Sequence, residues 1–165
     1  MKDILLKAGA HKNEVYTLLG MIDGALLSRG QLLVSAKMIE LALRTLTEGD
    51  LIIKSVAFDR EGKILLAAAT TGGMGLSYVF SLKKLEISNG TADAYATYTE
   101  TRQNGGLGGA LLGITGKSGL SFALAKHNWI RIDDSNIRIF SRNLPGFIGC
   151  SLIRCAQSGI LLKVY

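Results

Sequence analysis

The hydrophobic period of this chain changes near Gly49, and that change constrains the fold more than any motif does. Before it, apolar residues recur at helical spacing; from Leu51 onward they alternate with a period of two, and turn residues stand at hairpin spacing. Helices followed by a long run of strands are typical of the α+β class. We expect one domain, residues 1–165, with an N-terminal lead (1–12), a helical part (13–48) and an antiparallel sheet part (50–165).

Two amphipathic helices are expected in the helical part. The second begins after Ser35, whose hydroxyl oxygen makes a good N-cap, and Glu40 and Arg44 within it stand at ion-pair spacing. Its apolar face consists of Ile39, Ala42, Leu43 and Leu46. The first helix covers residues 13–27, and its apolar stripe consists of Val15, Leu18, Leu19, Ile22 and Leu26.

The sheet part is predicted to be a meander of eight or nine strands that covers a helix. Asn89-Gly90, between two alternating runs, is the strongest hairpin signal. Turn residues at Asp59–Gly62 and Gln157–Gly159 indicate two further hairpins. The expected strands are residues 51–58, 63–70, 78–87, 91–101, 119–125, 129–133, 137–142, 150–156 and 160–165.

Composition restricts the class of protein. An apolar fraction of 48% with 19% charged residues excludes a disordered chain, and two cysteines exclude a disulfide-dense scaffold. No apolar run reaches the roughly 18 residues that span a bilayer, and the apolar core of the first ten residues is too short for a signal peptide. We therefore expect a globular protein of the cytoplasm, with Cys150 and Cys155 as free thiols.

Residues that could carry chemistry do not form a recognisable catalytic set. His11 and His127 lack the spacing of metal ligands, and no activated nucleophile is evident. The glycine-rich segment Gly105–Gly119 contains Gly-Lys-Ser, but Leu111 stands where a phosphate loop needs glycine. We expect no enzyme activity, no cofactor and no metal.

Positive charge is concentrated at the C-terminal end. Residues 1–100 contain 11 Lys or Arg and 11 Asp or Glu, whereas residues 101–165 contain 8 and 2, so the net charge of +6 arises there. This asymmetry favours an anionic partner, although basic side chains on a solvated sheet face would give the same count.

Two neighbouring strands place arginines among aromatic residues. Alternation puts Trp129 and Arg131 on one face of the first strand, and Arg138, Phe140 and Arg142 on one face of the second. If the hairpin aligns these faces, the resulting patch could contact lipid headgroups or single-stranded nucleic acid. An ordinary exposed sheet face with isoleucines inside explains the same pattern.

The order of segments resembles the LmeA-like family of small lipid-binding proteins, within the tubular lipid-binding superfamily. The resemblance covers residues 31–165 and consists of hydrophobic patterns with turn residues. The segments that carry it are Val34-Ser35-Ala36 with the helix that follows, Ile53–Val56 with Gly62–Leu66, Leu82–Gly90, the proline turn Asn143–Gly146, and Ile153–Cys155 with Ser158–Leu162.

This resemblance implies a curved sheet that wraps a long helix, with an apolar groove between them that holds acyl chains. Members of the family usually carry an export signal, which is not recognisable here. The expected groove residues are Leu43, Leu46, Leu65, Leu85, Ile87, Leu124 and Ile132. The expected headgroup-binding residues are Arg131, Arg138 and Arg142, the arginines of the basic face predicted from alternation.

Three functions are consistent with these observations. The leading hypothesis is non-enzymatic binding of a lipid or other amphiphile, with a basic face towards the headgroups of an anionic membrane. The alternative is a protein-interaction or homo-oligomeric assembly module with a filled core. A single-stranded nucleic-acid binder is a further, less favoured alternative.

Overall fold

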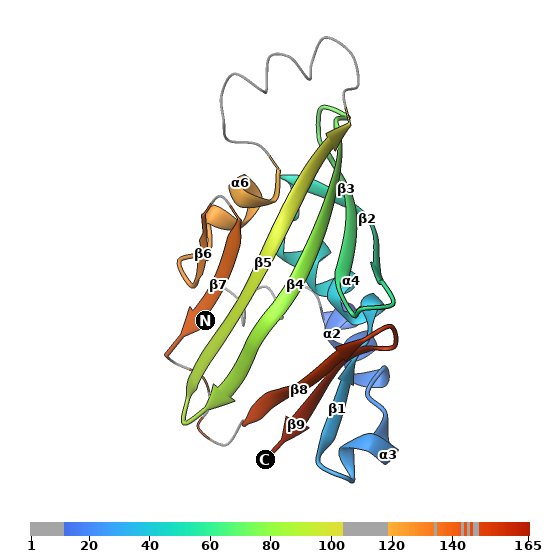
Figure 1. Cartoon of the computed structure of the whole chain (residues 1–165), viewed down its shortest axis with the longest axis vertical. Coiled ribbons are helices and arrows are strands. Elements are labelled where there is room, and N and C mark those ends of the chain that lie inside the picture. The colour runs from blue at the N-terminus through green and yellow to red at the C-terminus, as the bar shows by residue number, and fades with distance from the viewer. Residues whose placement is uncertain (1–11, 104–118, 134, 143, 145, 147–148) are drawn as a thin grey trace.

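A computed structural model describes residues 12–103, 119–133, 135–142, 144, 146 and 149–165 (Figure 1). The N-terminal lead up to His11 and most of the glycine-rich segment lie outside the described residues, as do parts of the expected proline turn. The described part is mostly antiparallel sheet with few helices. Its strands are β1 (Gln31–Val34), β2 (Leu51–Phe58), β3 (Ile64–Thr70), β4 (Gly75–Ser88), β5 (Thr91–Gln103), β6 (Ile130–Ile132), β7 (Asn136–Ser141), β8 (Cys150–Ala156) and β9 (Gly159–Val164).

The expected first helix is interrupted. Two shorter helices, α2 (Lys12–Gly20) and α3 (Gly24–Leu27), take its place. Asp23 separates them because its carboxylate Oδ1 accepts the backbone N–H groups of Ala25 at 2.8 Å and Leu26 at 3.3 Å, which makes it the N-cap of α3. Leu19, expected in a buried stripe, is 57% exposed. The prediction of one continuous helix over these residues was therefore wrong.

The second helix, α4 (Ala36–Leu46), agrees with the sequence pattern. Ser35 Oγ accepts the N–H of Met38 at 3.3 Å, and Arg44 Nη2 lies 2.7 Å from Glu40 Oε1. Ile39, Leu43 and Leu46 of its apolar face pack against the core of the sheet, whereas Ala42, expected on the same face, is exposed. The capping residue and the hydrophobic spacing together explain why this segment is helical.

The nine strands form one antiparallel sheet. Its main path runs β1-β9-β8-β4-β5-β7-β6, while β3 pairs with both β2 and β4. The predicted hairpin at Asn89-Gly90 is confirmed, with φ of 49° and 76° at the two residues, and so are the hairpins at Asp59–Gly62 and Gln157–Gly159. The pairing of β1 with β9, residues far apart in the sequence, could not be read from local patterns.

One predicted strand is a helix. Residues 119–125 were expected to be extended, but Leu120–Ala125 form α6. Leu120, Ala123 and Leu124 are buried at helical spacing, and Gly119 enters the helix with φ of +87°. A short apolar run of this length fits a strand or a buried helix equally well, so its neighbours in space decide.

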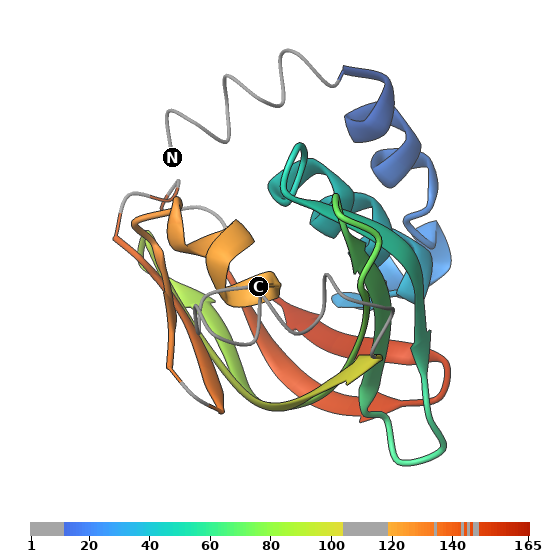
Figure 2. The same cartoon turned by 90° about the horizontal axis from the view of Figure 1, so that it is seen from above.

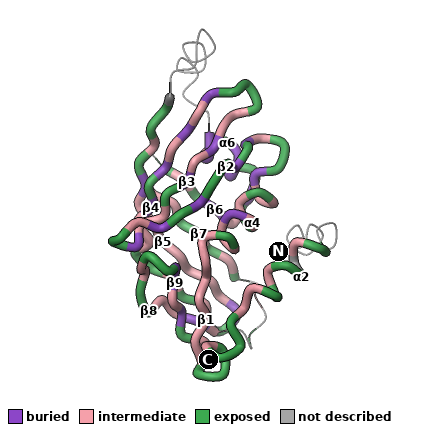
Figure 3. The backbone as a smooth tube through the Cα atoms, turned by 90° about the vertical axis from the view of Figure 1, so that its right-hand side faces the viewer, coloured by how far each residue is buried: buried purple, intermediate pink, exposed green. Residues whose placement is uncertain are grey.

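The sheet is strongly bent, and α4 and α6 lie on its concave side (Figure 2). Along the strands, buried positions alternate with more exposed ones, as the period of two requires (Figure 3). Two clusters of buried apolar residues form the interior. The larger lies between α4, α6 and strands β2–β5, and the smaller one consists of Phe58, Cys150, Ile160 and Leu162.

Candidate functional site

A β-bulge divides the long β4–β5 hairpin. Leu82 is opposite Ala96 and Lys84 is opposite Tyr95, so Lys83 is the extra residue. We call the part farther from the Asn89-Gly90 turn the upper half, and the part that contains the bulge and continues to the turn the lower half (Figure 1). The upper half comprises residues 75–81 and 97–103, and the lower half comprises residues 82–88 and 91–96.

The bulge decides which side chains of the lower half face the concave side. A regular continuation of β4 from Leu82 would turn Lys84 and Glu86 inward. The extra residue instead turns Leu85 and Ile87 inward, and both pack beside the smaller core cluster. The bulge therefore keeps the inner face of β4 apolar down to the hairpin turn.

The inner face of the upper half is filled by large side chains. Leu76, Tyr78, Phe80 and Tyr98 are each at most 9% exposed. The three rings contact one another in a triangle: the Phe80 centroid lies 5.9 Å from that of Tyr78 and 5.7 Å from that of Tyr98, and the two tyrosine centroids are 6.3 Å apart. Packing among protein side chains therefore accounts for the burial of this end of the sheet.

The Tyr78 hydroxyl joins the upper half to α6. It accepts the N–H of Leu120 at 2.9 Å, which satisfies a free donor in the first turn of the helix. Burial raises the pKa of the Tyr78 phenol, so the group stays neutral. A Cβ at Gly119 would collide with the same hydroxyl, which explains why glycine begins the helix.

The inner face of the lower half is apolar but incompletely covered. On β5, Ala92, Ala94 and Ala96 face inward, opposite Ile87, Leu85 and Leu82 on β4, and all six are only partly buried. Within the described part of the chain, the three alanines are not among the residues packed against either core cluster. Small side chains here leave an accessible apolar surface on the concave side of the sheet.

The structure distributes the seven expected groove residues over three places. Leu43, Leu46 and Ile132 pack at the margin of the larger cluster, and Leu124 lies inside it at 4% exposure. Leu85 and Ile87 belong to the open inner face of the lower half. Leu65 is 37% exposed on the opposite, outer face, because its neighbour Leu66 takes the inward position.

The three expected headgroup arginines lie on the outer face. Arg131 on β6 and Arg138 on β7 are directly opposite each other, and Arg138 is also level with Tyr95 on β5. Arg142 follows the last residue of β7. The sheet itself separates these side chains from the apolar inner face. The expected groove and the expected basic face therefore do not meet in one site.

Trp129 does not join the arginines on the outer face. It lies in the turn before β6, where strand alternation does not apply, and its ring packs against the larger core cluster and against His127 at 5.4 Å. The aromatic member of the outer patch is Phe140. Its ring centroid lies 5.1 Å from the Arg142 guanidinium and 6.0 Å from that of Arg138.

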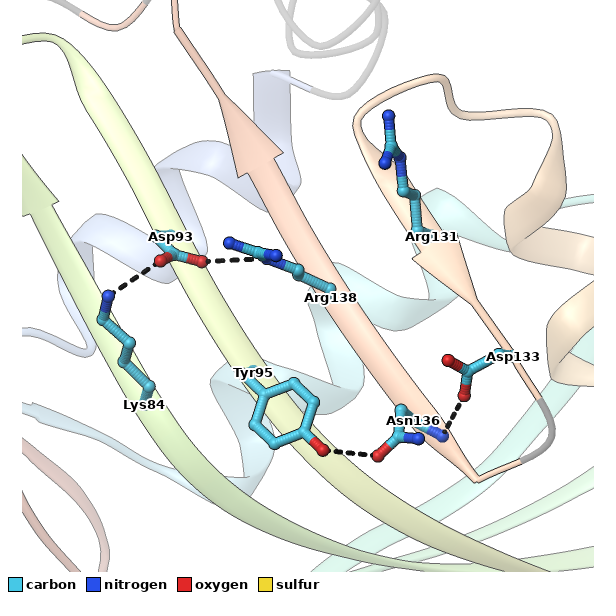
Figure 4. A pocket seen from close by; sticks show the side chains of 7 residues that line it. All are labelled: Lys84, Asp93, Tyr95, Arg131, Asp133, Asn136 and Arg138. Carbon is cyan, nitrogen blue, oxygen red and sulfur yellow. Dashed lines mark hydrogen bonds and ion pairs between the residues drawn. The ribbon is translucent and has the colours of Figure 1, made fainter.

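The outer face of the lower half contains a polar hollow of about 640 Å³ (Figure 4). We call it the outer hollow. Two hydrogen-bonded groups shape it: Asp93 with two cations, and Tyr95 with Asn136. Lys84 Nζ lies 2.8 Å from Asp93 Oδ2, Arg138 Nε lies 3.4 Å from Oδ1, and the Tyr95 hydroxyl donates to Asn136 Oδ1 at 2.6 Å. Its lining residues are Lys84, Asp93, Tyr95, Arg131, Asp133, Asn136 and Arg138.

The charges of the outer hollow are unevenly satisfied. The hydrogen bond from Lys84 lowers the pKa of Asp93, and the same contact raises the pKa of Lys84. Arg131 extends along β6, and no hydrogen bond or ion pair joins its guanidinium to another residue that the structure describes. Among the described residues that line the outer hollow, Arg131 is thus a cation without an ion-pair partner, and Arg138 is paired only through Nε.

Of the residues that line this hollow, the sequence analysis predicted Arg131 and Arg138 as anion-binding residues and did not predict the others. Alternation along β5 already puts Asp93 and Tyr95 on one face, so the signal was present. The pairing of β5 with β7 was not available from the sequence, and without it Asn136 and the arginines could not be placed beside that face. The bulge at Lys83 exchanges the inward and outward positions of β4 and so places Lys84 on the outer face, and no sequence signal indicated the bulge.

The described residues contain further titratable groups away from the outer hollow. No group of three or more His, Cys, Asp or Glu side chains there could hold a metal ion. Cys150 and Cys155 are free, and burial raises the pKa of both thiols. Over the same residues, no helix is long and apolar enough to cross a membrane.

Comparisons with protein families, with curated proteins and with solved structures found no match to this chain. A functional conclusion therefore depends on the two surfaces of the lower half.

Proposed function

We propose that the protein binds a lipid or another amphiphile on the inner face of the lower half. In this proposal the curved sheet wraps α4, and the apolar chain of the ligand lies along the strands below that helix, as the resemblance to LmeA-like proteins implies. The observation that supports it is the row of inward alanines, Ala92, Ala94 and Ala96, which are partly exposed although they occupy core positions.

The physical argument rests on the volume that small side chains leave free. A leucine or phenylalanine at these three positions would cover the strands with protein atoms, as Phe80 does in the upper half. An acyl chain can supply the missing contacts, and each CH₂ that it removes from water contributes about 0.8 kcal/mol. The flanking Leu85 and Ile139 would contact the chain from β4 and β7.

A pair of alanine substitutions tests this proposal. Ala94→Phe places a ring on the inner face of the lower half, whereas Ala57→Phe makes the same change at an exposed position on the outer face of β2. Titration with a fluorescent fatty-acid analogue gives the affinity of each variant. We expect Ala94→Phe to weaken binding at least about tenfold and Ala57→Phe to leave it unchanged.

Native mass spectrometry of the gently purified protein completes the test. An amphiphile at defined stoichiometry, lost in Ala94→Phe and kept in Ala57→Phe, supports the proposal. Equal affinity of the two variants for the analogue would contradict it, because the ring would then not compete with the ligand. Thermal unfolding of both variants verifies that they are folded.

A second candidate function is assembly with another copy of the chain. The outer face of β2, β3 and β4 exposes Ile52, Leu65 and Val79, and the last two are directly opposite each other. Exposed apolar residues on neighbouring strands are typical of contact surfaces. Light scattering that gives a concentration-dependent mass, reduced by Leu65→Ser, would favour this function; a constant monomer mass would exclude it.

A further inference from the structure

We propose that the outer hollow is a binding site for a phosphate monoester group, held between Arg131 and Arg138. The proposal does not depend on amphiphile binding, since the sheet separates the outer hollow from the inner face of the lower half.

The arrangement of charge is unfavourable without an anion. Arg131 and Arg138 occupy directly opposite positions on neighbouring strands, and like charges in this relation destabilise a sheet. Asp93 offsets part of the repulsion, but it also accepts a hydrogen bond from Lys84. Asp93 has no contact with Arg131 that could neutralise the second guanidinium. A bound anion between the two arginines removes this repulsion.

Hydrogen bonds within the outer hollow leave donor groups of Asn136 and Arg138 free for a ligand. Tyr95 donates its hydroxyl proton to Asn136 Oδ1, which leaves the amide NH₂ of Asn136 as a donor at the edge of the hollow. Arg138 contacts Asp93 through Nε, so its terminal nitrogens remain for a ligand. Arg131 starts from the position opposite Arg138, and its flexible side chain can reach the same anion.

Phosphate fits this donor set better than a carboxylate does. Three cations and two carboxylates line the hollow, so its net charge of +1 attracts an anion, and the geometry of the donors decides which anion fits. Guanidinium groups bind phosphate oxygens through two parallel hydrogen bonds, and a tetrahedral group has oxygens for two arginines at once. On the outer face, Phe140 contacts the arginines and Tyr95 is hydrogen-bonded to Asn136, whereas Trp129 packs against the core. Two rings with these contacts favour an anion over the continuous row of stacked rings that single-stranded nucleic acid uses.

The first measurement uses inorganic phosphate as the probe. Titration of the protein at about 0.1 M salt, followed by backbone NMR shifts, is expected to saturate with a Kd of roughly 1 mM or below, with the largest shifts at β6 and β7. We expect Arg131→Gln and Arg138→Gln each to weaken binding about tenfold, because each removes a charged pair of hydrogen bonds.

Arg154→Gln is the matched control. It removes the same charge from an exposed position on β8, outside the hollow. Equal weakening by all three substitutions would overturn the proposal, since only net charge would then matter. Shifts that do not saturate, or that centre elsewhere, would also overturn it. Thermal unfolding shows that each variant is folded.

A second arm identifies the source of the phosphate group. Glucose 6-phosphate represents a soluble monoester, and phosphatidylcholine vesicles containing phosphatidic acid present the same group on a membrane. Binding of either probe that depends on Arg131 supports the site and assigns its source. Vesicle binding without any binding of inorganic phosphate would overturn the proposal, because a general attraction to an anionic surface would then explain it.

Discussion

The two halves of the β4–β5 hairpin have the same backbone pairing but different inner faces. In the upper half, Tyr78, Phe80 and Tyr98 fill the concave side and are almost fully buried. In the lower half, the inward positions of β4 are still large, Leu85 and Ile87, but those of β5 are Ala94 and Ala92 in place of a ring such as Tyr98, and they stay partly exposed. A single sheet can thus form a packed core at one end and a partly exposed apolar surface at the other, and the small side chains of β5 contribute to that difference.

The bulge at Lys83 makes this combination possible. Bulges bend a strand and increase its twist, and this one falls at the junction of the two halves. It also keeps Leu85 inward and moves Lys84 to the outer face. The lower half therefore has an apolar inner surface and a charged outer hollow on the same strands.

The largest expected difference between the halves comes from removing a leucine side chain. Leu76→Ala deletes a side chain at 2% exposure, and we expect it to lower the free energy of unfolding by about 3 kcal/mol or more. Leu85→Ala on the same strand and face should lower it by about 1 kcal/mol, because less area is buried there. Urea unfolding gives the free energy of unfolding of both variants. Equal losses would contradict the expected difference between the two halves.

A smaller difference is expected from removing one hydroxyl group. Tyr78→Phe leaves the buried N–H of Leu120 without its acceptor and should lower the free energy of unfolding by about 1–3 kcal/mol. Tyr95→Phe, on the outer face of the lower half, removes a hydroxyl next to solvent and should change it by less than about 1 kcal/mol. Chemical denaturation of the two variants provides the comparison; a larger loss in Tyr95→Phe would contradict it.

The smallest effect is expected from the ion pair on the outer face of the lower half. Lys84 holds the pKa of Asp93 below its ordinary value of 3.8, so the pair stabilises the fold above that pH. The stabilisation is lost as the pH falls through the lowered pKa of the folded state. As the pH is lowered below 3.8, the free energy of unfolding should decrease slightly less in Asp93→Asn than in the unmodified chain, because the variant has no ion pair to lose. Identical curves would show that the pair does not contribute.

Much of the backbone could be predicted from local patterns. The hairpins at Asn89-Gly90 and Asp59–Gly62 follow from turn chemistry, and the start of α4 follows from the side chain of Ser35. Each of these signals lies within a few residues of the element that it specifies. Local chemistry is therefore sufficient for them.

The two incorrect helix and strand predictions have different causes, one a contact from far along the chain and the other a local cap. Residues 120–125 are helical because their apolar spacing fits the concave side and Tyr78, far away in the sequence, satisfies the first turn. Asp23 divides the first helix by capping α3, although the apolar period runs through it. In both places an interaction of one side chain overrides the periodicity of the segment.

The candidate site was predictable only in part for the same reason. The arginines were assigned to one face by alternation, and Arg131 and Arg138 are indeed opposite each other. Their position relative to the apolar surface depended on which face of the sheet is concave, which alternation does not specify. Leu65, expected in the groove, faces outward because Leu66 takes the core position.

The central claim is that the inner face of the lower half has room that the upper half lacks, and one pair of substitutions tests it directly. Ala68 on β3, directly opposite Leu76 of the upper half, is 4% exposed in the larger core cluster, whereas Ala94 is only partly buried on the inner face of the lower half. Replacing Ala68 by leucine should lower the free energy of unfolding by about 1–3 kcal/mol through overpacking, and Ala94→Leu should leave it unchanged or raise it by up to about 1 kcal/mol. A loss in Ala94→Leu as large as that in Ala68→Leu would show that the lower half is packed like the upper half and would contradict the account.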